Sequence, residues 1–488
     1  MLGAWLVLAA SACGDDSATR VGPVPATTDA GDRPGDGAAS GGGDAAGPPD
    51  ATDGDGLLRA PGYVRIASVA HELAKFNETI DACATRTPPS PGATVYYVAM
   101  HEPGADNDAC DGLAPSDEGA GRCPFRDFDS PRVRQLLVGV TNTRLEIRAG
   151  HYGLVPSRPF RTPTMDDPFV AQGIHIEANG TSDAERVVLT SYAREDVILD
   201  GEGHIRETVV LAGRYTLLEG LTIVNGGGYS VEVRGGDHHR VRCNQIGWSG
   251  SDALKGDGGA ADSEVLSNEF SDWSSQAIDN TDVHGWRIEG NVFHHPRLED
   301  ANATGAKFGC TDVLYTGNVF HHTRGLSMGG TSSEHEDAFE AMRIIARGNV
   351  FHDIVGVVAK LYSCVDCEFV ENDVRDTGGG VYFQGGDEAG ASGCPGGCAP
   401  SRGGHVAKNR FKRLDGGGSA ADANTFVWLS ATETDGFTAA ENVYCVPPGA
   451  DARFGYGDPV DFAGWQAATG ADADSSVLVD SDAACQGW

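Results

Sequence analysis

Apolar residues occur in short β-type runs along most of this chain, without the long 3.6-residue periodicity of helices. Each run ends in Gly or a polar residue, Asn follows, and one or two further apolar residues come after the Asn. Examples are residues 263–266, 286–289, 312–315, 343–346 and 367–370. The pattern predicts many short strands that are separated by sharp corners.

The phrase Gly-Asn-Val-Phe-His occurs at residues 290–294, 317–321 and 348–352, and weaker copies extend the series at intervals of 23 to 37 residues. A short period with variable insertions is typical of stacked supersecondary units. Asn tolerates the left-handed backbone conformation of a corner, and we expect each amide to bond to the Asn of the neighbouring coil. The corner asparagines are Asn268, Asn291, Asn318, Asn349, Asn372, Asn409 and Asn442.

Over roughly residues 93–445 this series resembles the right-handed parallel β-helix superfamily, which includes pectate lyases and related polysaccharide enzymes. The opening is also similar, because residues 94–98 form a β-type run and residues 145–153 end in the Gly-x-Tyr element typical of a first coil. The resemblance implies an all-β fold: one right-handed parallel β-helix of about ten coils with an N-terminal cap. A β-sandwich is the alternative, but its strands would alternate without a recurrent corner Asn.

The first 13 residues are a short apolar run that ends at Cys13. Small residues before a Cys resemble a bacterial lipoprotein signal, which implies lipidation of Cys13 and a place in the cell envelope. Ordinary secretion is the alternative. Residues 14–60 are rich in Gly, Ala, Asp and Pro and have almost nothing to bury, so we expect a flexible acidic tether.

The remaining chain divides into three expected regions. Residues 61–140 hold the cap and the first strands, including an amphipathic helix at 66–84 that covers the first coil. Residues 141–445 form the β-helix, and residues 446–488 form a C-terminal tail.

The formal net charge is −34 and the sequence pI is about 4.6. This charge argues against nucleic acid as a partner, because phosphate binding requires a basic surface. It is compatible with calcium, with neutral glycans, and with an acidic polysaccharide where a local basic patch exists.

The 12 cysteines predict disulfides in an oxidising compartment. Spacing suggests Cys110 with Cys123, Cys394 with Cys398, and Cys445 with Cys485. Cys364 and Cys367 together with Cys394 and Cys398 superficially resemble a four-thiolate zinc site, and disulfides are the favoured interpretation. The candidates for a free thiol are Cys243 and Cys310.

Three of the six lysines precede the corner Asn of their own coil by nearly the same count: Lys255 by 13 residues, Lys307 by 11 and Lys360 by 12. Side chains alternate in direction along a strand. Four neighbours are expected to point inward: Leu254, Ile278, Phe308 and Met328. An outward stripe should then contain, in order along the helix axis, Lys255, Asp279, Lys307, Ser327, Lys360 and Tyr382 or Gln384.

A row of cations on a sheet suits an acidic polysaccharide. In β-elimination a Lys removes the proton α to a uronate carboxyl, and calcium or a second cation neutralises the carboxyl. By superfamily resemblance the catalytic candidates are Lys307 as the leading base, Lys255 and Asp279. The expected substrate-binding residues are Lys360, Ser327, Tyr382 and Gln384. The expected calcium ligands are Asp252, Asp257, Asp279 and Asp282.

Three other interpretations stay open. The stripe can be a solvated ladder of alternating charges. Glycoside hydrolysis needs two carboxylates, which Asp279 and Asp282 with Asp252 or Asp257 could supply. A surface β-helix that binds glycan without catalysis is the third. A column of His294, His321 and His352 after the corner is more simply explained by repeated corner geometry than by a metal.

Overall fold

The computed structural model describes residues 83, 85–139, 141–154, 158–159, 171–298, 301–330, 339–384, 399–414, 425–429, 435–456 and 458–486. All of them belong to one compact unit. Cys13, the expected tether, the expected cap helix and the pair Cys394–Cys398 lie outside the described residues and stay predictions.

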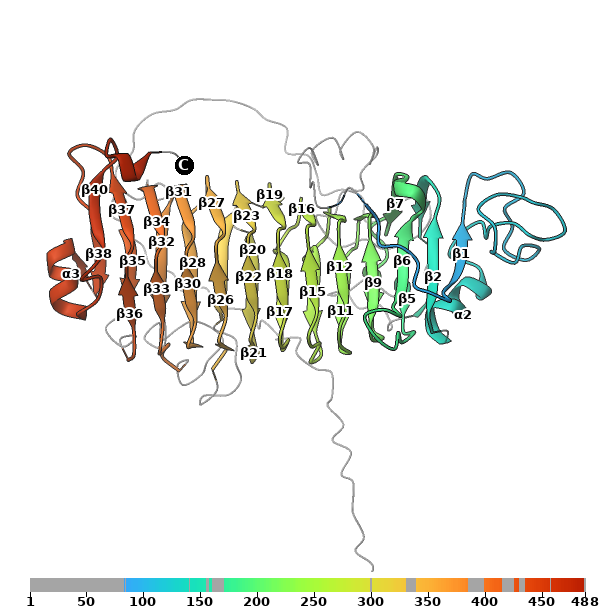
Figure 1. Cartoon of the computed structure of the whole chain (residues 1–488), viewed down its shortest axis with the longest axis horizontal. Coiled ribbons are helices and arrows are strands. Elements are labelled where there is room, and N and C mark those ends of the chain that lie inside the picture. Colours follow the sequence, from blue (N-terminus) through green and yellow to red (C-terminus); the bar gives the residue numbers. More distant parts are fainter. Residues whose placement is uncertain are drawn as a thin grey trace, which may run out of the picture. The chain divides into compact units, whose positions relative to one another are not determined.

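Three long sheets of parallel strands form the fold, and successive coils of the chain each add a strand to every sheet. The strands lie side by side in a row from β1 to β38 (Figure 1). The fold is therefore a right-handed parallel β-helix, as predicted. In the described residues two of the sheets have 12 strands each, so the solenoid is slightly longer than the expected ten coils.

Sheet 1 consists of β1 (Thr94–Val98), β2 (Thr143–Ile147), β6 (Val187–Ser191), β9 (Thr216–Glu219), β12 (Arg240–Arg242), β15 (Glu264–Leu266), β18 (Arg287–Glu289), β22 (Leu314–Thr316), β26 (Ile345–Arg347), β30 (Glu368–Val370), β33 (His405–Ala407) and β36 (Thr438–Ala440).

Sheet 2 consists of β3 (Gly150–Gly153), β7 (Val197–Asp200), β10 (Thr222–Val224), β13 (Gln245–Gly247), β16 (Glu269–Ser271), β19 (Val292–His294), β23 (Val319–His321), β27 (Val350–His352), β31 (Asp373–Thr377), β34 (Arg410–Leu414), β37 (Val443–Val446) and β40 (Ser476–Val479).

Sheet 3 consists of β4 (Arg158–Pro159), β5 (Ala171–Ile176), β8 (Glu207–Leu211), β11 (Tyr229–Arg234), β14 (Leu254–Asp257), β17 (Gln276–Thr281), β20 (Asn302–Lys307), β24 (Arg324–Gly329), β28 (Val357–Tyr362), β32 (Gly379–Gln384), β35 (Thr425–Leu429), β38 (Arg453–Tyr456) and β39 (Asp458–Val460). Its terminal strands β4 and β39 pair antiparallel with their neighbours. A small sheet links β21 (Cys310–Thr311), β25 (Ala341–Met342) and β29 (Cys364–Val365).

A ladder of buried asparagines lines the corner between sheets 1 and 2. The Nδ2 of Asn291 donates to Oδ1 of Asn318 at 3.0 Å, and Asn318 bonds in the same way to Asn349. The contact recurs from Asn244 to Asn442, which confirms the predicted stacking of amides. The left-handed conformation belongs to the residue before each Asn, with φ of +64° at Gly290, rather than to the Asn itself. This explains the Gly-Asn phrase, because Gly adopts positive φ without strain.

The interior is filled by inward side chains of the three sheets. Phe270, Phe293, Phe320 and Phe351 stack along sheet 2 with ring centroids 4.6 to 5.0 Å apart. Helix α2 (Pro131–Gly139) packs at the first coils, and α3 (Phe462–Thr469) packs on β38 at the other end (Figure 1). None of the helices in the described part of the chain has the length and hydropathy of a membrane-spanning segment.

Two predicted disulfides, Cys110–Cys123 and Cys445–Cys485, are present. Cys364 forms a disulfide with Cys367, so neither sulfur is a thiolate that could bind zinc at the suggested four-thiolate site. Cys310, one of the two candidates for a free thiol, is indeed free and buried. The other candidate, Cys243, is not free: it bonds to Cys83, 160 residues earlier.

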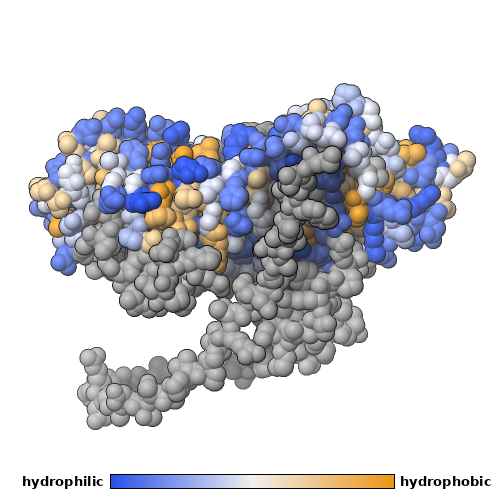
Figure 2. Space-filling model, turned by 90° about the horizontal axis from the view of Figure 1, so that it is seen from below, coloured by the Kyte–Doolittle hydropathy of each residue, from blue (hydrophilic) through white to orange (hydrophobic). Residues whose placement is uncertain are grey.

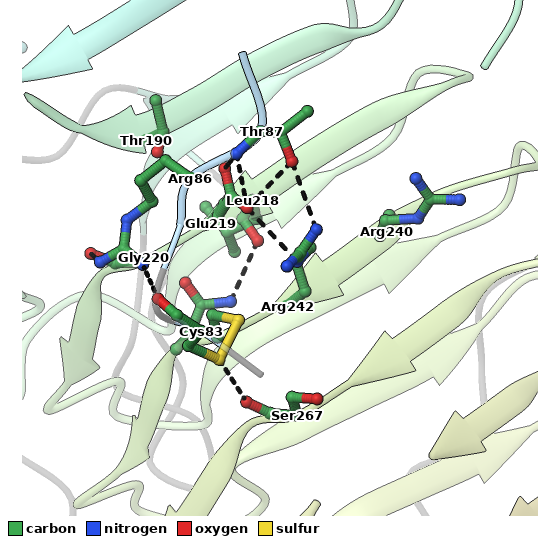
Figure 3. A network of polar contacts seen from close by, with 12 residues as sticks. Cys83, Arg86, Thr87, Thr190, Leu218, Glu219, Gly220, Arg240, Arg242 and Ser267 are labelled. Carbon is green, nitrogen blue, oxygen red and sulfur yellow. Dashed lines mark hydrogen bonds and ion pairs between the residues drawn. A yellow bond between two sulfur atoms is a disulfide. The ribbon is translucent and has the colours of Figure 1, made fainter. Parts of the chain in front are cut away.

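The Cys83–Cys243 disulfide fixes a strap, residues 85–87, on the outer side of sheet 1 (Figure 3). The carboxylate of Glu219, which is fully buried, accepts hydrogen bonds from Thr87 N at 2.9 and 3.1 Å and from Thr87 Oγ1 at 3.0 Å. Arg86 donates to Ser191 Oγ at 3.1 Å and to Gly220 O at 3.3 Å. The strap therefore occupies sheet 1 across β6, β9 and β12.

Candidate functional site

Ion pairs continue along the outer side of sheet 1 beyond the strap. Arg240 Nη2 lies 2.5 Å from Glu264 Oε2, and Arg287 bonds to both Glu264 and Glu289. Figure 2 shows a face of the described chain on which hydrophilic residues predominate and hydrophobic ones are scattered in small groups. The carboxyls whose pKa burial raises lie instead at sheet 3, on or beside β8, β11 and β14: Glu207, Glu232, Asp252 and Asp257.

The strand register aligns one outward position of sheet 3 across eight strands. This outer column contains, in order along the axis, Glu232, Lys255, Asp279, Gly305, Ser327, Lys360, Tyr382 and Trp428. The predicted stripe is therefore confirmed at five positions, but Lys307 does not belong to it. Gly305 occupies that position, and Lys307 pairs with Thr281, two residues further along the same face.

Side-chain packing explains the error at Lys307. Ala306, not Phe308, takes the inward position, where it is fully buried between Asn280 and Met328 in the register. Phe308 has a φ of +55° and is 39% exposed, because the chain turns a corner there. The predicted inward side chains of Leu254, Ile278 and Met328 are fully buried.

Asp279 is held between two lysines. Lys255 Nζ donates to Asp279 Oδ2 and, at 2.6 Å, to Thr281 Oγ1, while Lys307 Nζ lies 3.1 Å from Asp279 Oδ1. Gln276 Nε2 also donates to Asp279 Oδ1 at 3.1 Å. Burial alone would raise the pKa of Asp279, but the two lysines outweigh it and hold the pKa below its ordinary value.

Asp252 is a second buried carboxyl beside this triad. It lies just before β14, is 4% exposed, and its Oδ1 accepts a hydrogen bond from Gln276 N at 3.1 Å. Burial, followed by repulsion from Asp279, raises the pKa of Asp252 to about 7 against the attraction of Lys255 and Lys307. Near neutral pH Asp279 is thus ionised, while Asp252 can hold a proton. This difference between two neighbouring carboxyls is typical of acid–base pairs.

Lys255 is surrounded by acidic groups that favour its charged form. Burial would lower the pKa of Lys255, but Asp279 and then Tyr229 and Asp252 raise it overall, so Lys255 stays protonated. Burial also raises the pKa of Tyr229 to about 12, which keeps its phenol as a hydroxyl donor near this group. The lysine arrangement therefore favours charge neutralisation over proton abstraction by Lys255.

A second group of charges adjoins the first on β8, β11 and β14. Glu232 receives two hydrogen bonds from Arg234, at 3.1 Å from Nε and 2.5 Å from Nη2, and Arg206 Nη1 donates to Glu207 Oε1 at 2.6 Å. Burial, then the charges of Glu207 and Asp257, raise the pKa of Glu232 to about 8. Sequence inspection missed Glu232 because its burial results from packing between coils.

One buried acceptor in this region, Gln276 Oε1, accepts no hydrogen bond from the described residues. Gln276 lies against Gly305, where an added Cβ would be 2.1 Å from its Oε1. Gly305 thus makes room for the amide that orients Asp279. Such an acceptor suits a ligand or water that supplies a hydroxyl donor.

The expected calcium ligands do not form one cluster in the described residues. Asp252 and Asp279 bond to Gln276 and to the lysines, Asp257 lies beside Glu232, and Asp282 is 3.4 Å from His284 Nε2 with 55% of its side chain exposed. No group of three His, Cys, Asp or Glu able to hold a metal occurs in the described part of the chain. Calcium binding stays a prediction.

The other predicted binding residues extend the column toward the C-terminus. Ser327 Oγ donates to Gly329 O at 3.0 Å, and Lys360 and Tyr382 follow in register. Gln384 pairs with Tyr362, two residues beyond the column, and its side chain lies outside the described residues. Trp428 continues the column after Tyr382, and the sequence could not have placed its side chain outward, because every residue of β35 after Thr425 is apolar.

The histidines after the corner stack as a repeated structural feature. His294 and His321 lie 5.1 Å apart between ring centroids, and His321 and His352 lie 5.0 Å apart. His294 Nε2 is 3.1 Å from Glu269 Oε1. This agrees with the interpretation that corner geometry repeats the same residue type.

No protein-family model and no curated protein matches this sequence. Solved structures of β-helix proteins do match. The A-module of mannuronan C-5 epimerase AlgE4 from Azotobacter vinelandii matches at 12% identity and a TM-score of 0.45, covering 78% of this chain and 99% of that one. Pectate lyase Pel9A matches at 12% identity and a TM-score of 0.36, covering 78% of each chain.

A tailspike protein of Escherichia coli bacteriophage HK620, solved with a pentasaccharide, matches at 13% identity and a TM-score of 0.44, covering 78% of this chain and 64% of that one. These similarities concern the fold alone. The three parallel sheets make the fold a right-handed parallel β-helix, and the residues on the outer side of sheet 3 form its candidate site.

Proposed function

We propose that this protein acts on a polysaccharide by acid–base catalysis on the outer side of sheet 3. The observation that carries the proposal is a pair of buried carboxyls that are bridged by one residue: Gln276 donates from N to Asp252 Oδ1 and from Nε2 to Asp279 Oδ1, each at 3.1 Å. Burial raises the pKa of Asp252 to about 7, whereas Lys255 and Lys307 lower that of Asp279. Acid–base chemistry near neutral pH needs one group that gives a proton and one that stays ionised. The carbohydrate-related names of the similar structures agree with a glycan as the substrate.

Glycoside hydrolysis is the reaction that this pair supports best. Protonated Asp252 donates its proton to the glycosidic oxygen as the bond to the anomeric carbon breaks. Ionised Asp279 stabilises the positive charge that develops on the sugar ring or orients the attacking water. Lys255 and Lys307 keep Asp279 ionised, and Tyr229 supplies a hydroxyl donor beside them.

β-Elimination on an acidic polysaccharide is the second candidate. Two lysines face the outer side of sheet 3 around one carboxylate, so that a uronate carboxyl placed there meets a lysine ammonium. In that reaction Lys255 neutralises the substrate carboxyl, and Lys307 or ionised Asp252 removes the α-proton. Calcium, if bound by the carboxylates, would assist in the neutralisation.

The test incubates the protein with pectate, alginate, glycosaminoglycans, xylan and β-glucans, with and without calcium. New reducing ends without unsaturated products would support hydrolysis, and ultraviolet-absorbing unsaturated products would support elimination. Asp252→Asn and Asp279→Asn should each abolish the activity. Asp312→Asn, an exposed carboxylate paired with Arg343, is the matched control and should retain it. Activity that survives in Asp252→Asn would overturn the acid–base assignment.

We also propose a place in the cell envelope, with Cys13 as the lipid anchor and residues 14–60 as the tether. The disulfides among the described residues support an oxidising compartment. Membrane fractionation of Cys13→Ala in the native host tests the anchor, since release of the protein into the soluble fraction is expected. Unchanged fractionation would contradict it.

A further inference from the structure

The outer column ends in two aromatic residues. Tyr382 on β32 and Trp428 on β35 are neighbours in register, with ring centroids 6.1 Å apart and planes inclined by 32°. Trp428 is partly exposed, whereas Val427 and Leu429 on either side of it are fully buried. The indole therefore belongs to the outer side of sheet 3 and not to the core.

A glycine on the next strand seats the indole. Gly455 on β38 pairs with Trp428 in register, one strand beyond the column, and an added Cβ there would lie 2.0 Å from Trp428 Cε3 and 2.2 Å from Cδ2. Any side chain at position 455 would displace the ring. The indole thus lies across β38 instead of standing away from the sheet.

The aromatic pair shares its column with Asp279, one member of the acid–base pair. From Asp279 the column passes Gly305, Ser327, Lys360 and Tyr382 before it reaches Trp428, which makes five strand steps. At about 4.8 Å per step the two ends are about 24 Å apart. Only an oligosaccharide or a longer chain can bridge that span.

Resting on the proposed function, we propose that Trp428 forms a distal platform for sugar rings of the same polysaccharide. Tyr382, which is only 9% exposed, supports the indole from the neighbouring strand. Sugar rings have faces lined by C–H groups, and these faces pack on aromatic rings. Lys360 and Ser327, between the platform and Asp279, supply the polar contacts of the intervening sugars. The protein therefore engages the interior of a long chain that lies parallel to the helix axis, and short fragments leave the platform empty.

The experiment separates binding from turnover. Retention by polymers in affinity electrophoresis is measured for the full chain carrying Asp252→Asn, alone and with Trp428→Ala, Trp428→Phe or Gly455→Ala. The probes are pectate, alginate, hyaluronan, xylan and β-glucan, together with size-fractionated oligosaccharides of each. Val355→Ala, an exposed apolar residue outside the column, is the control. Thermal melting verifies that each variant is folded.

We expect Trp428→Ala and Gly455→Ala to weaken polymer binding by about tenfold, equivalent to about 1.4 kcal/mol, and to leave the shortest bound fragments unaffected. Trp428→Phe should restore most of the affinity. With catalytic Asp252 present, Trp428→Ala should raise KM for polymer without lowering kcat. Equal binding of polymer by Trp428→Ala and its parent would overturn the platform, as would an equal loss for polymer and fragments.

The two proposals fail in different ways. If the wild type cleaves a polymer and Trp428→Ala has the same KM, the platform is wrong and the acid–base site stands. If nothing is cleaved but a polymer is retained and Trp428→Ala loses it, the platform stands and catalysis is wrong. If no polymer is either retained or cleaved, both are overturned.

Discussion

Lys307 and Asp279 lie on neighbouring strands of sheet 3 and two residues apart in register, and Lys307 Nζ reaches Asp279 Oδ1 at 3.1 Å. Lys255 approaches the same carboxylate from the other side. The ammonium of Lys307 also acts on Asp252, where its charge lowers the pKa. One side chain thus influences both carboxyls of the proposed acid–base pair.

Lys307→Met should therefore raise the pKa of Asp252 above about 7, because one of its two stabilising cations is lost. If protonated Asp252 is the general acid, the alkaline limb of the kcat/KM profile moves to higher pH. Lys408→Met is the control, since Lys408 is half exposed at a distant corner and lies 3.9 Å from Glu441. A limb that stays in place would contradict the assignment, and loss of activity at every pH would favour Lys307 as the base of an elimination.

Asp252→Asn should stabilise the fold more at alkaline than at acidic pH. Between the ordinary pKa of 3.8 and about 7 the unfolded chain loses this proton while the folded chain keeps it, so the wild type loses stability as pH rises through that window. The difference corresponds to an upper bound of about 4 kcal/mol above pH 7. Calorimetric melting near pH 4 and near pH 8 measures it. If the difference in unfolding free energy between Asp252→Asn and the wild type does not grow with pH, ionisation of Asp252 does not destabilise the folded state.

The fold was predictable because the corner Asn is a local requirement that every coil repeats. Its amide has to satisfy the backbone of two neighbouring coils, so the residue recurs wherever the chain turns. The column on sheet 3 was predictable only in part, since the count to the corner Asn varies between coils. It is 13 residues from Lys255 and Gly305 but 12 from Asp279 and Lys360, and counting cannot decide between Gly305 and Lys307.

Other parts of the site depend on contacts that sequence distance hides. Lys307 and Gly305 both face outward because strand side chains alternate, so the prediction had the correct face and the wrong position. Burial of Asp252 and Glu232 comes from packing of neighbouring coils, which their own sequence context does not reveal. The partner of Cys243 is 160 residues away, and disulfide connectivity does not follow from spacing.

Asn318→Ala should destabilise the β-helix by about 2–4 kcal/mol, because it leaves several buried partners unsatisfied. Asn318 Oδ1 accepts from the backbone N and the Nδ2 of Asn291, and its Nδ2 donates to Ile288 O and Asn349 Oδ1. Asn179→Ala, at an exposed position, should change the stability by no more than about 0.5 kcal/mol. Denaturant unfolding of both variants checks the difference. Similar losses of unfolding free energy in the two variants would mean that the asparagine ladder contributes little to the stability of the β-helix.

Removing the Cys83–Cys243 disulfide should be the most destabilising of the disulfide deletions. It closes a separation of 160 residues, compared with 40 for Cys445–Cys485 and 13 for Cys110–Cys123. In the chain-entropy model these loops correspond to about 5, 4 and 3 kcal/mol. The strap adds to the effect, because release of residues 85–87 leaves the buried carboxylate of Glu219 without the hydrogen bonds from Thr87 (Figure 3).

Paired Cys→Ser variants of each bridge, melted under identical conditions, rank the three. Glu219→Gln in the intact protein separates the two contributions, since it weakens the strap contacts while the disulfide remains. A smaller loss for Cys83→Ser with Cys243→Ser than for the Cys110–Cys123 pair would contradict the loop-closure argument. It would mean that the first residues of the described chain are held on sheet 1 by the Arg86 and Thr87 contacts even without the bridge.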